Sequence, residues 1–377
     1  MLAMAVLEGR DSIHSLKSLI ADDWNFLLVR GKASYQTSGA RSIIDLQIAD
    51  HIVGEFFDFD PNPKLSDVQE GVCQFERSNA NAILAIGGGS VIDMGKLIGL
   101  FAAQPEGSVV FPPDTPNNYL RAFPIVVLPS TSGTGSEVTN FAVMYKDGKK
   151  FSICDQSILP HIAIIDPALT DNLPSYITAC SGLDAFCQAV ESIWSSNSSP
   201  ESEPLAVESL QLTLQWLERA VSVGDMDSRD GMAKSATLAG RAINITKTTA
   251  PHALSYGLTS FFGVPHGHAV AHFIGPLLRF NEQVTTFDCA DDRGVSFVRS
   301  KLELIYDALG VKSANQAKSR IESMIERVGL TFNLKKVGVS EESELQMLAS
   351  QVNLERLANN PRRMSHDDLL SVLHESM

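Results

Sequence analysis

The sequence predicts a parallel α/β domain followed by an all-α domain, with the boundary between residues 173 and 174. Two observations predict this fold class. Over residues 1–173 short β-rich runs alternate with helical patterns, whereas residues 174–377 read as long amphipathic helices. A third observation places the boundary, because DNLPSY (171–176) contains the proline and asparagine typical of a connecting segment. A chain of 377 residues also exceeds the size at which one hydrophobic core usually keeps growing.

The first domain is predicted to be a sheet of parallel strands covered by helices. Its strand-like runs are NFLLVR (25–30), ANAILAI (80–86), FPIVVLP (123–129) and HIAIIDP (161–167). Between the first two runs, KLSDVQEGVCQFERS places its apolar residues on one helical face. Strand, helix and strand in succession indicate parallel pairing, since parallel strands need a crossover connection. An Asp-Gly pair in VMYKDGKKFSI predicts a β-hairpin inserted after the third of these strands.

The charge and composition exclude several classes of partner. A formal net charge of -14 disfavours nucleic acid and anionic membranes, because both are bound through clustered Lys and Arg. The first residues contain too short an apolar run for a signal peptide, so we expect a cytoplasmic protein. Its five cysteines form no C-x-x-C pair and are expected to be reduced.

Two polar loops predict a phosphate-binding site in the first domain. In AILAIGGGSVIDMGK a buried strand leads through Gly87, Gly88, Gly89 and Ser90 into a helix, where backbone N–H groups can approach an anion closely. The alternative is a tight strand-to-helix turn without a ligand. The loop lacks the G-x-G-x-x-G pattern, since Ile92 stands at the third glycine. The second loop, LPSTSGTGSEVT, also follows a strand, and two such loops indicate a pyrophosphate held from two sides.

The helical half contains a candidate metal site. Asp184 and Gln188 are four residues apart and share a helix face, and His252 and His266 follow later in the chain. A divalent metal accepts an aspartate and two imidazoles, and an amide oxygen can complete the set. The alternatives are that Asp184 serves the start of a helix and that each histidine is a hydrogen-bonded structural residue.

These motifs together resemble the iron-containing, or group III, alcohol dehydrogenase family. The matching segments are PNPKLSDV (61–68), GGGSVIDMGK (87–96), PSTSGTGSEVT (129–139), DPAL (166–169), GLDA (182–185) and PHG (265–267). The resemblance implies a Rossmann-like dinucleotide-binding domain (1–173) and a helical metal- and substrate-binding domain (174–377), with the fold of dehydroquinate synthase. It implies hydride transfer between a nicotinamide and a carbonyl that Fe²⁺ or Zn²⁺ polarises in the cleft between the domains.

The resemblance also assigns residues to the metal and the cofactor. The metal ligands would be Asp184, Gln188, His252 and His266, although the family ordinarily has histidine in place of Gln188. The cofactor residues would be Gly31, Asn62, Gly87, Gly88, Gly89, Ser90, Asp93, Thr131 and Ser132. Members that prefer NAD tend to have an aspartate at the position of Gly31. Because a carboxylate repels a 2′-phosphate, a glycine flanked by Arg30 and Lys32 favours NADP(H) over NAD(H).

The segment before His252 indicates an anionic substrate. Ordinary members carry small neutral residues there, whereas this chain has Thr246, Lys247, Thr248 and Thr249. Lysine and threonine supply the charge and hydroxyl donors that a phosphonate needs. The segment resembles the branch of the family that acts on phosphonoacetaldehyde and 2-hydroxyethylphosphonate. The substrate-binding residues would be Arg241, Lys247, Thr248 and Tyr256, with Lys247, His252 and His266 catalytic.

Several alternatives stay open from the sequence. Lys247 can instead be a solvated lysine at a helix end. His268 and His272 are candidates for returning a proton to the product, although buried structural histidines are the more common case. The substrate can be another small neutral or carboxylated aldehyde, and the protein can be a lyase similar to dehydroquinate synthase or a non-catalytic sensor. We also expect a homodimer.

Overall fold

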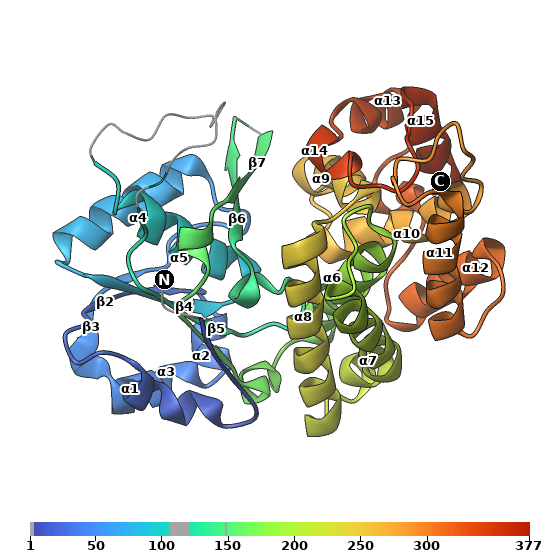
Figure 1. Ribbon diagram of the computed structural model, residues 1–377. Coiled ribbons are helices and arrows are strands. Elements are labelled where there is room, and N and C mark those ends of the chain that lie inside the picture. The colour runs from blue at the N-terminus through green and yellow to red at the C-terminus, as the bar shows by residue number, and fades with distance from the viewer. Residues whose placement is uncertain (1–3, 106–118, 120, 148) are drawn as a thin grey trace. The chain divides into compact units, whose positions relative to one another are not determined.

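The computed structural model describes residues 4–105, 119, 121–147 and 149–377. The chain divides into two compact units, Met1–Leu173 and Pro174–Met377 (Figure 1). The first unit contains a sheet and its covering helices, and the second is built from helices. This architecture confirms the predicted fold class.

The first unit is built on a six-stranded sheet in which every neighbouring pair is parallel. The strands lie in the order β1 (Ala5–Glu8), β8 (Ile162–Ile165), β5 (Ile125–Pro129), β4 (Ala82–Gly87), β2 (Phe26–Arg30) and β3 (Ile52–Phe56). The four predicted runs are β2, β4, β5 and β8. Strands β1 and β3, which form the two edges of the sheet, were not predicted from the sequence.

Both faces of the sheet are covered, and alternate residues of each strand face opposite layers. On β2, Leu27 and Val29 join one core with α4 (Leu65–Arg77) and α5 (Gly89–Phe101). Phe26 and Leu28 join the other core, which includes residues of the shorter helices. Those helices are α1 (Leu16–Leu19), α2 (Ser34–Thr37) and α3 (Ala40–Gln47). Figure 1 shows α4 and α5 on one side of the sheet and α1 to α3 on the other. Burial on both faces explains why the central strands read as continuous apolar runs.

The predicted hairpin forms a separate two-stranded sheet. Strands β6 (Phe141–Lys146) and β7 (Lys149–Cys154) pair antiparallel, with Lys146 opposite Lys149. This register leaves a two-residue connection, and Asp147 has a φ of 51°, as the first central residue of a type I′ turn requires. Gly148, the second residue of the predicted turn, lies outside the described residues.

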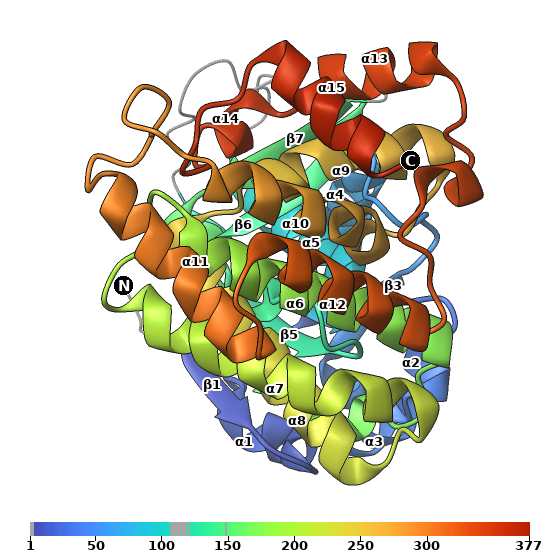
Figure 2. The same ribbon diagram turned by 90° about the vertical axis from the view of Figure 1, so that its right-hand side faces the viewer.

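The second unit is a bundle of helices around two buried members, α6 and α10 (Figure 2). Its helices are α6 (Ser175–Trp194), α7 (Ser202–Ser222), α8 (Met226–Thr246), α9 (Ala250–Phe262), α10 (His266–Glu282), α11 (Val295–Leu309), α12 (Ala314–Arg327), α13 (Glu342–Ser350), α14 (Leu354–Leu357) and α15 (His366–Glu375). Helix α6 packs against α7, α8 and α10, and α10 also packs against α9 and α12. Several polar residues of these helices, among them Asp184, Gln188 and Glu191 of α6 and His268 and His272 of α10, are therefore buried inside the bundle.

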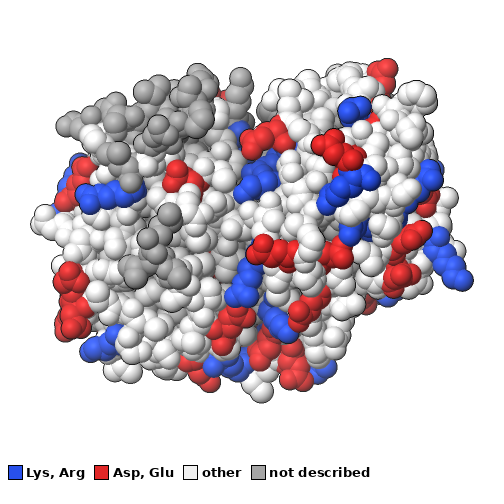
Figure 3. All heavy atoms as spheres, viewed as in Figure 1, with Lys and Arg blue, Asp and Glu red and all other residues white. Residues whose placement is uncertain are grey.

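The surface of the described residues carries charges of both signs. On the face shown in Figure 3, Lys and Arg are interspersed with Asp and Glu and form no continuous basic tract among the described residues. Within the described part of the chain, no helix combines the length and the apolar character needed to cross a bilayer.

Candidate active site

Three loops of the first unit meet at the N-terminus of α5. The Ser90 hydroxyl accepts a hydrogen bond from the Asn62 backbone N–H at 3.2 Å. A side chain at Gly89 would place its Cβ 2.6 Å from Thr134 Cγ2, so only glycine fits there. A Cβ at Gly88 would lie 3.3 Å from Thr131. The loops around Asn62, Gly89 and Thr131 therefore surround a helix N-terminus whose N–H groups can bind phosphate.

Lys96 and Asp93 of α5 fix the second polar loop. The Lys96 amine is fully buried and donates to the carbonyls of Ser136 (2.5 Å), Thr139 (2.8 Å) and Phe141 (3.0 Å). Burial lowers the pKa of this amine to about 8, although Asp93 opposes the shift. Asp93 accepts from the Ser136 hydroxyl at 2.6 Å and from a backbone N–H of β6. Asp93, predicted to contact the cofactor, thus holds the loop in place, and Lys96 was missed.

The other predicted cofactor residues lie at strand ends. Gly87 ends β4, and Thr131 and Ser132 follow β5, so both polar loops leave neighbouring strands at the same edge. Gly31 follows β2 directly. Its flanking charges are neutralised, because Arg30 pairs with Glu55 at 2.7 Å and Lys32 with Asp58 at 2.9 Å. A preference for NADP(H), which carries a 2′-phosphate, would therefore rest on the missing carboxylate at Gly31. Arg30 and Lys32 already have carboxylate partners.

Asp184, His252 and His266 meet inside the second unit. Their ligand atoms all lie within 4.8 Å of one another. His252 Nε2 is 3.4 Å from an Asp184 oxygen, and the two imidazole rings are 5.1 Å apart between centroids. One carboxylate and two imidazoles form a donor set that suits Fe²⁺ or Zn²⁺. Gln188 is buried one turn after Asp184 on α6, where its role as a fourth ligand stays a prediction.

Gly267 explains how His266 reaches this cluster. A Cβ at Gly267 would lie 2.1 Å from the Cys180 carbonyl oxygen and 2.7 Å from the Cβ of Asp184. The first turn of α10 therefore approaches the backbone of α6 more closely than any side chain would allow. The motif PHG thus sets the distance between His266 and Asp184.

His252 is oriented by Glu191, a residue that the sequence analysis did not single out. Glu191 is fully buried on α6, and its carboxylate accepts a hydrogen bond from His252 Nδ1. Burial lowers the pKa of His252, but the carboxylates of Glu191 and Asp184 outweigh that effect and raise it to about 9. A carboxylate can only accept a hydrogen bond, so His252 Nδ1 carries a proton. The other ring nitrogen, Nε2, is the one that faces Asp184.

Lys247 lies in the three-residue link between α8 and α9 and has a rare backbone conformation. Its φ of 58° and ψ of 171° fall in a region that essentially only glycine adopts. Its side chain is partly exposed, and its amine donates to the Asn244 carbonyl at the end of α8 at 3.1 Å. This contact is the one expected of a lysine at a helix end, so the amine has a structural partner whether or not it also meets a substrate.

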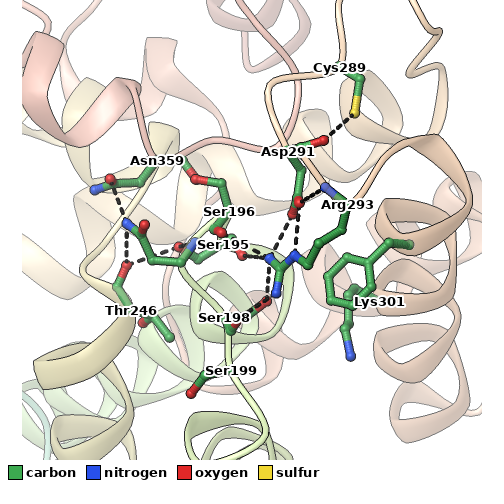
Figure 4. Close-up of polar contacts among 12 residues, drawn as sticks. Ser195, Ser196, Ser198, Ser199, Thr246, Cys289, Asp291, Arg293, Lys301 and Asn359 are labelled. Carbon is green, nitrogen blue, oxygen red and sulfur yellow. Dashed lines mark hydrogen bonds and ion pairs between the residues drawn. The ribbon is translucent and has the colours of Figure 1, made fainter.

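Hydrogen bonds to consecutive peptide groups hold this link. The Thr246 carbonyl accepts from Ser195 and Asn197, the Lys247 carbonyl from the Thr246 hydroxyl, and the Thr248 carbonyl from Asn359. Figure 4 shows Thr246 and Asn359 beside the 195–199 loop. Arg293 anchors that loop by donating to the carbonyls of Ser195, Ser196 and Ser198, and it pairs with Asp291. The strained conformation is therefore imposed from three chain segments.

The other predicted substrate residues lie on α8, the link and α9. Arg241 is partly exposed on α8, and Thr248 is buried in the link. Tyr256 is one turn after His252 on α9 and hydrogen-bonds to Arg356. Burial raises the pKa of Tyr256, and Arg356 opposes this shift. Arg356, buried on α14 three residues before Asn359, is a cation beside Tyr256 that the sequence pattern did not indicate.

His268 and His272 are both buried on α10 and bonded to backbone. His268 Nε2 donates to the Thr331 carbonyl at 2.6 Å, and His272 Nδ1 donates to the His268 carbonyl at 2.8 Å. Burial, with a smaller contribution from His268, lowers the pKa of His272 to about 4. These contacts are those of structural histidines, and a role for either residue in proton return stays a prediction.

We expect His272 to make the protein sensitive to mild acid. Its pKa is depressed in the folded state, so the unfolded state binds the extra proton between pH 6.5 and about 4. Stability should be unaffected above pH 6.5 and fall by up to ~3 kcal/mol as the pH drops through this window. His272→Gln should lose less unfolding free energy between pH 7 and pH 4.5 in urea titrations. His366→Gln, at an exposed site, is the control, and equal pH slopes for wild type and His272→Gln would contradict the prediction.

A helix N-terminus framed by polar loops in an α/β unit, together with an Asp-His-His cluster of two buried residues and one partly exposed residue in a helical unit, defines a metal-assisted oxidoreductase of the nicotinamide class. The chain belongs to the iron-containing alcohol dehydrogenase family. Residues 4–167 match the model described as "Iron-containing alcohol dehydrogenase", and residues 178–377 match "Fe-containing alcohol dehydrogenase family, C-terminal". It is therefore an enzyme that acts on alcohols or aldehydes, which confirms the predicted enzyme class and removes the lyase and sensor alternatives.

Three similar proteins show the range of substrates in the family. The chain is 33% identical over 315 residues to phosphonoacetaldehyde reductase of Streptomyces viridochromogenes, covering 80% of this chain and 78% of that protein. It is 34% identical over 262 residues to choline dehydrogenase of Bacillus subtilis, covering 68% and 65%. The crystal structure of sulfoacetaldehyde reductase from Bifidobacterium kashiwanohense with NAD+ superposes with a TM-score of 0.84 at 26% identity, covering 100% and 97%.

Proposed function

We propose that this enzyme reduces phosphonoacetaldehyde to 2-hydroxyethylphosphonate, as part of phosphonate biosynthesis. The observation that carries the proposal is Lys247, a cation in a strained link five residues before His252. Two similar proteins, the phosphonoacetaldehyde and sulfoacetaldehyde reductases, act on two-carbon aldehydes with an anionic tail. A phosphonate carries up to two negative charges, and Lys247 with Arg356 would supply two positive ones.

The residues of the second unit have distinct parts in this proposal. Asp184, His252 and His266 would hold a divalent ion, Fe²⁺ or Zn²⁺, with Gln188 as a weak fourth partner. When bound, that ion supplies Lewis acidity to the aldehyde oxygen and the reduced nicotinamide supplies the hydride. Lys247, Thr248 and the Tyr256–Arg356 pair would hold the phosphonate and so fix the orientation of the aldehyde. Asp184 and His252 are buried, whereas His266 is partly exposed.

The test is an absorbance assay of NADPH and NADH oxidation with a panel of aldehydes. Phosphonoacetaldehyde should give the highest kcat/KM, above sulfoacetaldehyde, a carboxylated aldehyde and propanal, and activity should require added Fe²⁺ or Zn²⁺ after chelation. A higher kcat/KM for propanal than for phosphonoacetaldehyde would overturn the proposed substrate.

A second candidate keeps the chemistry and changes the substrate to a neutral or carboxylated aldehyde. The contact that favours it is the hydrogen bond from the Lys247 amine to the Asn244 carbonyl, which gives the amine a structural role. The same panel separates the candidates, because a helix-end lysine would not discriminate between charged and neutral aldehydes.

We also propose that NADP(H) is preferred over NAD(H). Wild type should show the higher kcat/KM with NADPH. A Cβ at position 31 would lie 2.1 Å from the Ser34 hydroxyl, so the fair test is Gly31→Asp combined with Ser34→Ala. This double variant should move the ratio of kcat/KM values toward NADH by about tenfold or more, or ~1.4 kcal/mol, because a carboxylate repels the 2′-phosphate. Ser34→Ala alone is the control, and a tenfold preference of wild type for NADH would contradict the prediction.

A further inference from the structure

Glu191 contacts both the Asp184–His252–His266 cluster, through His252, and the link that carries Lys247, through Thr249. It lies seven residues after Asp184 and three after Gln188, so α6 presents all three on one face. Its carboxylate is fully buried, and a buried charge is tolerated only when hydrogen bonds replace its hydration. Both of its oxygens meet groups of the α8–α9 region, which lies about 60 residues further along the chain.

One carboxylate oxygen fixes the ring of His252. Glu191 Oε2 accepts from His252 Nδ1, which leaves Nε2 as the nitrogen that faces Asp184. A histidine that binds a metal through one nitrogen is commonly held at the other nitrogen by a carboxylate, which sets both tautomer and ring orientation. Glu191 stands in that relation to His252.

The other carboxylate oxygen caps helix α9. Glu191 Oε1 accepts from the Thr249 N–H at 2.8 Å, from the Thr249 hydroxyl at 3.0 Å and from the His252 N–H at 3.4 Å. Thr249 is the N-cap of α9 but makes no capping bond with its own side chain. Glu191 thus supplies from α6 the acceptor and the negative charge that the start of a helix needs. Trp194 also donates to the Thr249 hydroxyl at 2.8 Å, which fixes it further.

The cap determines where the strained link ends. Thr249 is two residues after Lys247, whose backbone conformation persists only if both ends of the link are held. Ser195 and Asn197 donate to the Thr246 carbonyl, and Asn359 donates to the Thr248 carbonyl. Glu191 accepts from the next N–H, that of Thr249.

We propose that Glu191 is a positioning residue that aligns the metal-ligand nitrogen of His252 and, through Thr249, the link that carries Lys247. The metal part rests on the predicted ligand role of His252, and the Lys247 part rests on the proposed function. The Glu191 carboxylate would thereby fix the position of the metal ligand His252 relative to Lys247, the residue proposed to bind the phosphonate.

The first test measures metal affinity without substrate or cofactor. Zn²⁺ is titrated against a chromophoric chelator in wild type and in Glu191→Gln. The glutamine can still accept from the backbone of α9, but its NH₂ group would face Nδ1 and favour the tautomer that protonates Nε2. We expect Zn²⁺ affinity to fall about 10- to 100-fold. Unchanged affinity would overturn the proposal.

A matched control separates this effect from general loss of a helix cap. Glu282 accepts from the Ala314 N–H at the start of α12 and from the Tyr306 hydroxyl, so it also caps a helix from another element. Glu282→Gln should lower thermal stability and leave Zn²⁺ affinity unchanged. Should Glu191→Gln fail to fold, ¹⁵N–¹H spectra of the histidine rings of Zn²⁺-loaded wild type decide the same point. They should show His252 protonated at Nδ1, and protonation at Nε2 would overturn the proposal.

The second test addresses the link. Thr249→Val removes the hydroxyl that donates to Glu191 and accepts from Trp194, while the bond from His252 to Glu191 remains. Zn²⁺ affinity should stay at the wild-type value, whereas KM for phosphonoacetaldehyde should rise about 2- to 10-fold and KM for propanal should not. Equal changes for both aldehydes would overturn the link part. Weaker Zn²⁺ binding in Glu191→Gln without any turnover of phosphonoacetaldehyde by wild type would sustain the metal part and overturn the proposed substrate.

Discussion

Replacing His266 with alanine should remove tight divalent-metal binding and, with it, aldehyde reduction. Asp184 and His252 would be left as the only members of the described three-residue cluster, and two ligands hold Fe²⁺ or Zn²⁺ poorly. The loss of affinity should exceed the roughly 100-fold that marks the loss of a ligand's hydrogen-bond partner. Zn²⁺ titration against a chelator measures the binding, and NADPH oxidation measures the turnover.

Gln188→His is the complementary variant. An imidazole binds Fe²⁺ and Zn²⁺ better than an amide oxygen does, so this change should strengthen metal binding if residue 188 faces the ion. The control for His266→Ala is His374→Ala, which removes a histidine at an exposed site on α15. Full activity of His266→Ala after exhaustive chelation would show that the reaction needs no metal at this cluster.

The strands that were predicted from the sequence are those buried on both faces of the sheet. Strands β2, β4, β5 and β8 are buried on both faces and read as apolar runs, as a covered parallel sheet requires. The edge strand β3 has the sequence IVGEF, with a glycine and a glutamate among partly exposed positions, and β1 has two of its four residues exposed. Strand β3 therefore lacks a continuous apolar signal. Strand β1 ends the apolar run MLAMAVL (1–7), which is too short to be distinguished as a strand by its pattern alone.

The same distinction applies to the site. Asp184, His252 and His266 carry motifs, and the structure brings them together. Lys96, Glu191 and Arg356 are buried charges whose partners lie 40 or more residues away in the chain, or on another helix, and local spacing does not reveal such pairs. A signal for Glu191 did exist, because it follows Asp184 and Gln188 at helical spacing on a buried face.

Lys247→Ala should lower kcat/KM for phosphonoacetaldehyde roughly 30- to 1,000-fold, since losing one charge-assisted contact in a partly desolvated site costs about 2–4 kcal/mol. Propanal has no group that meets this charge, so its kcat/KM should change little. Lys234→Ala is the matched control, because Lys234 lies on α8 and pairs with Glu208 on the surface. It should leave both substrates unaffected.

The strained backbone of Lys247 permits a sharper comparison. Because its φ and ψ suit glycine, Lys247→Gly should relieve strain of ~1–3 kcal/mol, while Lys247→Ala retains it. Urea unfolding should therefore rank the glycine variant as more stable than the alanine variant, yet both should lose phosphonoacetaldehyde turnover to a similar extent. This result would show that the charge of Lys247 is needed for turnover of phosphonoacetaldehyde although the residue strains the backbone. Equal losses for phosphonoacetaldehyde and propanal would instead assign Lys247 to the end of α8, and no loss for either would remove it from the site.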